Sequence, residues 1–333
     1  MIRTVLVIAS FLLAACAAAG VASDASVKPT KSSDSRDALM AAWERKGKRL
    51  SFIDSHDHNK DGRVSSIEFE QSRRDRFDQT DSNNDRLVDE QEYAFEWEDR
   101  MNTQLDIDRN ARMGQTFVRF DAMDKDDDER MSWDEYAASG DRIFTGRDTN
   151  EDNVIDALDP PAVNRWTPKP ESELTADELK RRQEWQIGSA RALLEMPTTH
   201  NLAGVFARYD LNGDERVERA EFDGKRRADY NATDFDKDGT LTASEYAGEF
   251  EDRMDTVIAN YRESSIKQSR RRFQSLDAND DAVMTFTEYQ DSGRRILARH
   301  DVTQDGYVDS DDPLADPIDR GQDQQIATNT NTR

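Results

Sequence analysis

The segment Asp57–Glu68 reads DHNKDGRVSSIE and places oxygen-bearing side chains at its first, third, fifth and twelfth positions. A hard divalent cation such as calcium takes six to eight oxygen ligands. A twelve-residue loop supplies them from positions 1, 3, 5, 7, 9 and 12. Gly62 occupies the sixth position, where such a loop turns sharply with a positive φ. The spacing therefore predicts a loop that binds a hard cation.

Seven further segments follow the same pattern, and we number all eight in chain order. Loops 1–8 are Asp57–Glu68, Asp81–Glu92, Asp124–Glu135, Asp148–Asp159, Asp210–Glu221, Asp234–Glu245, Asp277–Glu288 and Asp301–Asp312. Each of loops 5–8 begins 153 residues after its counterpart among loops 1–4. A constant offset of this kind predicts an internal duplication.

The predicted ligands of each loop are the side chains at positions 1, 3, 5 and 12 and the backbone carbonyl at position 7. In loop 1, Ser65 or its water fills the ninth position. The full predicted set is Asp57, Asn59, Asp61, Arg63, Glu68, Asp81, Asn83, Asp85, Leu87, Glu92, Asp124, Asp126, Asp128, Arg130, Glu135, Asp148, Asn150, Asp152, Val154, Asp159, Asp210, Asn212, Asp214, Arg216, Glu221, Asp234, Asp236, Asp238, Thr240, Glu245, Asp277, Asn279, Asp281, Val283, Glu288, Asp301, Thr303, Asp305, Tyr307 and Asp312.

Apolar residues accompany every loop, which a merely solvated charge run does not explain. The eighth position is expected to join a short strand between paired loops, and it holds Val64, Val88, Met131, Ile155, Val217, Leu241, Met284 and Val308. The position four residues before each loop is expected to pack in a helical core, and it holds Ile53, Phe77, Phe120, Phe144, Phe206, Tyr230, Phe273 and Leu297.

The loops differ in how closely they follow the pattern. Loops 1 and 6 match it throughout, whereas loops 2, 3, 5 and 7 replace Gly at the sixth position by Arg86, Glu129, Glu215 and Ala282. A non-Gly residue in a left-handed conformation costs roughly 1 kcal/mol, which lowers the expected affinity. Loops 4 and 8 end in Asp159 and Asp312. Because the shorter Asp chelates less easily with both oxygens, six-coordination and magnesium are expected there alongside calcium.

The spacing of the loops predicts an all-α fold of two duplicated four-loop units, at 37–160 and 190–313. Only residues 69–80 separate loops 1 and 2, which leaves room for one shared helix about 18 Å long. Between loops 2 and 3 we expect a helix, a turn near 106–110 and another helix, so that these two loops pair. Loops 1 and 4 then flank this pair at the far ends of its outer helices, where they could meet each other.

The region between the two predicted units, 161–189, is expected to be a Pro-containing linker that leads into a helix. Thr175 and Glu178 have the spacing of a capping box, which predicts a helix from 175 to about 195.

The N-terminal residues 1–16 have the pattern of an export signal, with one basic residue and an apolar run. Cys16 ends a segment, 13–16, that resembles the lipobox of bacterial lipoproteins, which predicts a lipid anchor through Cys16. The alternative is an ordinary signal peptide cut after Ala19 or Ala22. The protein is thus expected to be exported, as a periplasmic or membrane-tethered lipoprotein or else a secreted protein, with a flexible tether at 17–36 and a disordered tail at 314–333.

The composition excludes some classes of function. The chain has 70 acidic and 46 basic residues and a formal net charge of −24, which repels nucleic acid and attracts cations. No nucleophile with a nearby base stands out, so we do not expect an enzyme. Its four histidines are scattered, and three lie beside or inside loops, where solvated neighbours are expected rather than zinc ligands.

Loops with these residues resemble those of the EF-hand superfamily, over residues 37–160 and 190–313. The short spacing between loops 1 and 2 is similar to that of bacterial tandem EF-hand proteins. The resemblance implies calcium binding by an extracytoplasmic buffer or a calcium-stabilised envelope module. The alternative is a calcium sensor or adaptor that presents a surface to a partner protein, whose identity the sequence does not indicate.

Overall fold

A computed structural model of the chain describes residues 32–159, 169–196, 199 and 201–313, with side chains from residue 41 onward. The described part is mostly helical, which confirms the predicted all-α class. Its helices are α1 (Ser32–His56), α2 (Ser66–Thr80), α3 (Glu90–Met123), α4 (Trp133–Thr145), η1 (Glu171–Glu173), α5 (Ala176–Arg191), α6 (Leu202–Tyr209), α7 (Arg219–Thr233), α8 (Ala243–Leu276) and α9 (Phe286–His300).

Each loop contains one strand of two residues, and these strands pair antiparallel. They are β1 (Val64–Ser65), β2 (Val88–Asp89), β3 (Arg130–Met131), β4 (Val154–Ile155), β5 (Val217–Glu218), β6 (Leu241–Thr242), β7 (Val283–Met284) and β8 (Tyr307–Val308). The pairs are β1 with β8, β2 with β7, β3 with β6 and β4 with β5. Every loop of the first half therefore pairs with a loop of the second half, in reverse order along the chain.

The predicted pairing of loop 2 with loop 3 is wrong, and loops 1 and 4 do not pair with each other either. Helix α3 runs unbroken for 34 residues, so it holds loops 2 and 3 about 50 Å apart at its two ends. The turn expected near 106–110 does not form, because no Pro or Gly interrupts the chain between Met101 and Met113. Helix α8, with the same 34-residue length, separates loops 6 and 7 in the same way.

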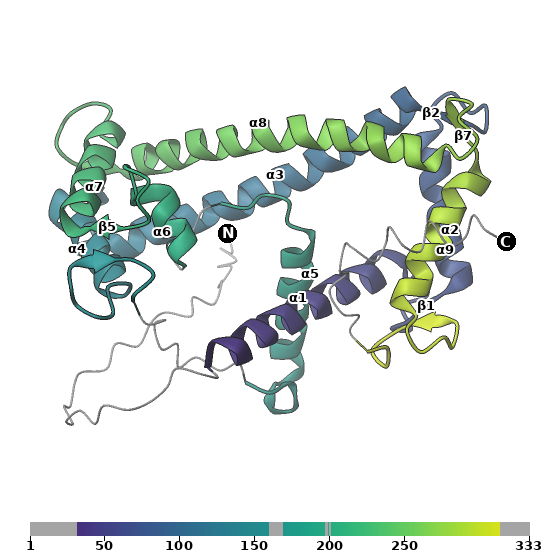
Figure 1. Cartoon of the computed structure of the whole chain (residues 1–333), viewed down its shortest axis with the longest axis horizontal. Helices are drawn as coiled ribbons and strands as arrows, with labels where there is room; N and C mark the ends of the chain where they lie inside the picture. The colour runs from purple at the N-terminus through teal and green to yellow at the C-terminus, as the bar shows by residue number, and fades with distance from the viewer. Residues whose placement is uncertain (1–31, 160–168, 197–198, 200, 314–333) are drawn as a thin grey trace, which may run out of the picture.

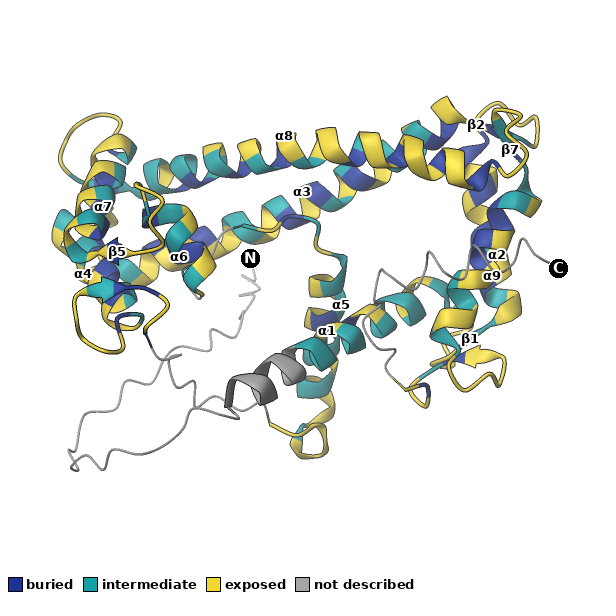
Figure 2. Cartoon of the chain, in the orientation of Figure 1, coloured by how far each residue is buried: buried dark blue, intermediate teal, exposed yellow. Residues whose placement is uncertain are grey.

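Helices α3 and α8 lie side by side along the long axis of the molecule (Figure 1). They run antiparallel, since the strand that precedes α3 pairs with the strand that follows α8. One end of this helix pair carries α2 and α9, and the other carries α4, α6 and α7. Buried residues of the two long helices lie along their facing sides (Figure 2).

The core between the long helices is small and is completed by the segment that connects α5 to α6. Met101 and Leu105 of α3 pack with Met254 and Ile258 of α8, and Leu194 of the connector joins them with none of its surface exposed. Hydrogen bonds hold the connector in place: Asp108 Oδ2 accepts from the backbone N–H groups of residues 193 and 194, at 2.6 and 3.0 Å. The returning half of the chain is thereby tied to the middle of α3.

The predicted helix after Thr175 is confirmed as α5, with Thr175 and Glu178 forming the expected capping box, although it ends at Arg191 rather than near residue 195. Helix α5 packs along α1, and the rings of Trp43 and Trp185 meet edge to face at 5.9 Å. Helix α1 begins at Ser32, inside the stretch expected to be a tether.

The export signal, Cys16, the tail and most of the Pro-rich part of the linker lie outside the described residues. Of the helices described, none is long and apolar enough to cross a membrane.

Replacing Leu105 by Ala tests the central core. Leu105 is 1% exposed, so the substitution leaves a cavity between α3 and α8 and should lower the free energy of unfolding by about 2–5 kcal/mol. Ile107 lies on the same helix but is 56% exposed, and Ile107→Ala should change this free energy by less than about 1 kcal/mol. Urea denaturation followed by circular dichroism measures both, and equal effects would contradict the described packing.

Candidate metal sites

All eight loops follow the same backbone path. The sixth residue has a positive φ in every loop, as the sequence predicts for this position, and so has the fourth, which we did not anticipate. These residues are Lys60 and Gly62, Asn84 and Arg86, Asp127 and Glu129, Glu151 and Asn153, Gly213 and Glu215, Lys237 and Gly239, Asp280 and Ala282, and Gln304 and Gly306. Loops with Gly, Asn, Glu, Arg or Ala at the sixth position thus adopt the same backbone conformation, although its conformational free-energy cost differs between these residues.

The first aspartate of a loop organises its backbone. In loop 2, Asp81 Oδ1 accepts from the backbone N–H of Asp85 at 3.1 Å, and its Oδ2 accepts from that of Arg86 at 2.8 Å. Equivalent bonds to the first aspartate occur in loops 1, 3, 4, 5, 7 and 8. The loop therefore wraps around a carboxylate, and that carboxylate lies near its centre.

The carboxylate at the twelfth position closes the loop from the other side. Glu92 Oε1 accepts from the N–H groups of residues 82 and 83, at 3.0 and 3.1 Å, and Glu92 Oε2 accepts from that of Asp89 at 3.1 Å. Asp89 returns a bond to the Glu92 N–H, so that the pair caps helix α3. Glu92, in the first turn of the helix, is thus also the residue that closes the loop.

Loops 4 and 8 close in the same way although they end in aspartate. Asp312 accepts from the N–H groups of residues 302, 303 and 309 at 2.7, 3.0 and 3.0 Å, and Asp159 makes the corresponding bonds in loop 4. In loop 8 the Thr303 hydroxyl also donates to Asp312, at 3.1 Å. The hydroxyl of Thr303, a predicted ligand, is therefore hydrogen-bonded to a carboxylate of its own loop.

The predicted ligands gather most closely in loops 3 and 6. Carboxylate oxygens of Asp124, Asp126 and Asp128 lie within 4.8 Å of one another, and so do those of Asp234, Asp236 and Glu245. These two loops pair through β3 and β6, which makes them neighbours. Each group could hold a metal ion.

The remaining loops have fewer carboxylates because an amide or hydroxyl replaces one at the third position. Loops 1, 2, 4, 5 and 7 carry Asn59, Asn83, Asn150, Asn212 and Asn279 there, and loop 8 carries Thr303. The amide nitrogen of each asparagine donates to the aspartate at the fifth position, at 2.9–3.2 Å. Its amide oxygen accepts from the backbone N–H of that aspartate in all five loops. The third and fifth side chains are thus held against each other.

The Asp234 side chain fits a cation particularly well. Asp234 is 9% exposed, and its Oδ1 is buried without a hydrogen-bond partner among the described residues. A buried carboxylate oxygen without a donor carries a desolvation penalty that a bound cation would remove.

Electrostatics in the other cluster point the same way. Desolvation and the nearby carboxylates of Asp128 and Glu135 raise the pKa of Asp126. This mutual repulsion favours any positive ion that enters loop 3.

Two contacts that cross from loop 3 to loop 6 escaped the sequence analysis. The Tyr230 hydroxyl lies 2.9 Å from both the Met131 and the Gly239 carbonyl oxygens, one in each loop. Arg130 of loop 3 forms an ion pair with Asp238 of loop 6. Hydrogen bonds from Thr240 and this ion pair lower the pKa of Asp238 to about 2. Neither contact has a sequence signal, because both require knowing which loops pair.

Comparison with known protein-family models, with curated proteins and with solved structures gives no match to this chain.

Replacing Gly239 by Ala tests the strain at the sixth position. Gly239 has a φ of +89°, and nothing lies within 4 Å of an added Cβ, so any cost comes from the backbone alone. We expect a loss of about 1–2 kcal/mol in the free energy of unfolding. Gly248→Ala, inside α8 and equally uncrowded, should instead stabilise by about 0.5–1 kcal/mol. Thermal or urea unfolding of both variants decides, and two changes of the same sign would contradict a loop-specific strain.

Proposed function

We propose that the protein binds calcium through eight EF-hand loops, as an exported buffer or calcium-stabilised module. The observation that carries this proposal is the clustering of three carboxylates in each of the paired loops 3 and 6. It is supported by the backbone path that all eight loops share. In each loop, backbone N–H groups point at a carboxylate near the centre, so the atoms that remain to bind an ion are oxygens. An all-oxygen ligand set suits calcium or magnesium better than zinc or copper.

The loops are proposed to differ in ion preference. Loops 3 and 6 offer the most carboxylates and should bind most tightly. Loops 4 and 8 end in aspartate and should discriminate least between calcium and magnesium, because magnesium requires only six ligands, held at shorter distances. Affinities in the range of about 10⁻⁴ to 10⁻³ M, typical of extracellular calcium modules, suit an exported protein.

Ion binding is proposed to stabilise the fold of the whole chain. Every loop pair joins the first half of the chain to the second half. Filling a pair therefore favours the closed arrangement over one in which the halves separate. Eight divalent ions would change the net charge from −24 to −8, which relieves repulsion among the loops.

Replacing Glu245 by Gln tests the site in loop 6. Loss of the bidentate carboxylate should remove about one ion from the stoichiometry and weaken binding in the paired loop 3. Glu263→Gln provides the control, since Glu263 is an exposed residue of α8 that pairs only with Lys267 among the described residues. Calorimetric titration with calcium, in buffer that contains magnesium, measures the count. An unchanged count in the Glu245 variant would refute a site there.

The ion preference of loop 4 can be tested with Asp159→Glu. The longer side chain should chelate with both oxygens and raise the affinity for calcium relative to magnesium by several-fold. Glu151→Asp, at a fourth position that supplies no predicted ligand, should leave the ratio unchanged. Competition titrations of the two ions give the ratio, and a shift in the control alone would contradict the assignment.

A further inference from the structure

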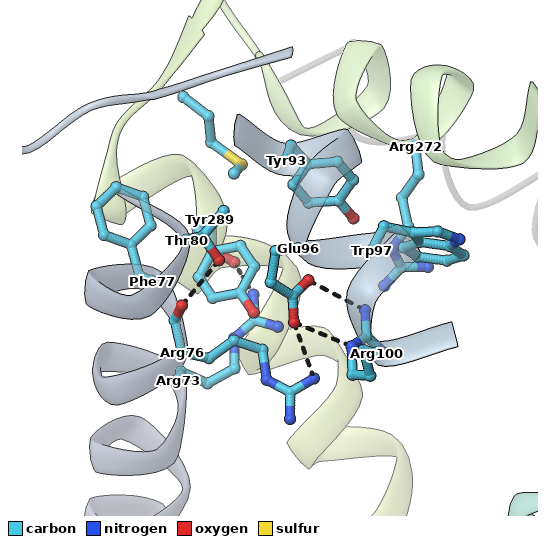
Figure 3. A pocket seen from close by; sticks show the side chains of 11 residues that line it. Arg73, Arg76, Phe77, Thr80, Tyr93, Glu96, Trp97, Arg100, Arg272 and Tyr289 are labelled. Atoms are coloured by element: carbon cyan, nitrogen blue, oxygen red, sulfur yellow. Dashed lines mark hydrogen bonds and ion pairs between the residues drawn. The ribbon is translucent and has the colours of Figure 1, made fainter. Parts of the chain in front are cut away.

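A cavity of about 300 Å³ lies at the corner where α2, α3, α8 and α9 meet, next to the β2–β7 pair (Figure 3). Four aromatic rings, those of Phe77, Tyr93, Trp97 and Tyr289, form part of its wall. Four arginines also line it: Arg73, Arg76, Arg100 and Arg272. None of the loop carboxylates lines the cavity. Ion binding by the loops therefore does not account for the arginines and aromatic rings that do.

Positive charge predominates in this corner. Glu96 is the one carboxylate in the lining, and it accepts from Arg100 Nε at 3.0 Å and lies 3.9 Å from an Arg76 nitrogen. Arg73 and Arg272 form no ion pair with any carboxylate in the part of the chain that the structure describes. Such an excess of guanidinium groups is notable in a chain whose net charge is −24.

Arg73 is the most deeply placed of the four, with 8% of its surface exposed. It donates to the Tyr289 carbonyl and to the Ser292 hydroxyl, and its guanidinium carbon lies 3.3 Å from the centre of the Tyr289 ring. A charge removed from water in this way attracts an anion more strongly than an exposed one.

The corresponding corner at the other end of the molecule differs in an informative way. At the positions 153 residues later, Asp229 stands in place of Arg76, Arg208 in place of Ser55, and Glu249 in place of Glu96. Arg208 reaches toward both carboxylates, with one nitrogen 3.1 Å from Asp229 and 4.0 Å from Glu249. That corner is therefore filled by a guanidinium group of the chain itself.

In the first corner the place of Arg208 is taken by Ser55. The Ser55 hydroxyl donates to the Ser51 carbonyl of its own helix at 2.7 Å and accepts from Arg191 Nη2 at 2.9 Å. Arg76 has the opposite charge from its counterpart Asp229. The two changes together remove the guanidinium–carboxylate pair of the other corner and make the lining more basic.

We propose that this corner binds a small organic anion, with a carboxylate or phosphate group held by the arginines and an apolar or aromatic body against Trp97 and the tyrosines. Planar guanidinium forks bind both kinds of oxyanion in a bidentate manner. Aromatic walls favour an aromatic body over inorganic ions. The volume suits a compact ligand, at the low end of known ligand pockets.

The test is a calorimetric titration of the full chain with benzoate and, separately, with phenyl phosphate; these two probes distinguish a carboxylate from a phosphate ligand. One equivalent of at least one anion should bind, and neutral benzyl alcohol should not. Arg272→Gln should weaken binding about tenfold. Arg119→Gln alters the counterpart of Arg272 at the other corner and should leave binding unchanged. No binding of either anion at about 10 mM, or equal effects of the two variants, would overturn the proposal.

A double variant gives this corner the charged residues of the other corner without altering its buried apolar side chains. Ser55→Arg combined with Arg76→Asp copies the filled corner and should abolish anion binding while the helical content measured by circular dichroism stays unchanged. Persistent binding in this double variant would contradict the assigned location. These measurements report on a site whose lining contains no loop carboxylate, so their failure is distinguishable from failure of the proposed ion binding.

Discussion

The pairing of each loop with a loop from the other half of the chain is the contact on which the rest of the architecture depends. Each bridge buries two apolar residues of the eighth position, such as Val64 against Val308 and Met131 against Leu241. Because the order is reversed, the chain must fold back on itself once, between loops 4 and 5. Each loop pair then constrains the directions of the helices that precede and follow its two loops.

The long helices transmit this constraint across the molecule. Helices α3 and α8 can lie antiparallel only because both of their ends are held by loop pairs of opposite halves. Their shared core is modest, and the connector around Leu194 completes it by bonding to Asp108 and by inserting an apolar side chain. A chain with so few apolar residues thus stabilises its centre with one well-placed segment rather than with a large core.

The two ends of the molecule show how one repeated plan produces different chemistry. Arg73 and Arg226, 153 residues apart, make the same bonds: to the carbonyls of Tyr289 and Tyr136, and to the hydroxyls of Ser292 and Ser139. Around this shared framework a few side chains differ. Those differences close one corner with an internal guanidinium group and leave the other as an open basic cavity.

The sequence by itself determined the loops, their carboxylates at the twelfth position and the apolar eighth positions, because these follow from spacing within twelve residues, and it indicated the helical class through the spacing between the loops. It also predicted the helix that begins at Ala176. Only the tertiary structure decided which loops pair and that Tyr230 and Arg130 link loops 3 and 6, whereas the absence of Pro and Gly around residues 106–110 already favoured a continuous α3. Local spacing cannot distinguish pairing within a half from pairing between halves, since the apolar eighth residues are interchangeable. The rigidity of two uninterrupted 34-residue helices selects the second arrangement.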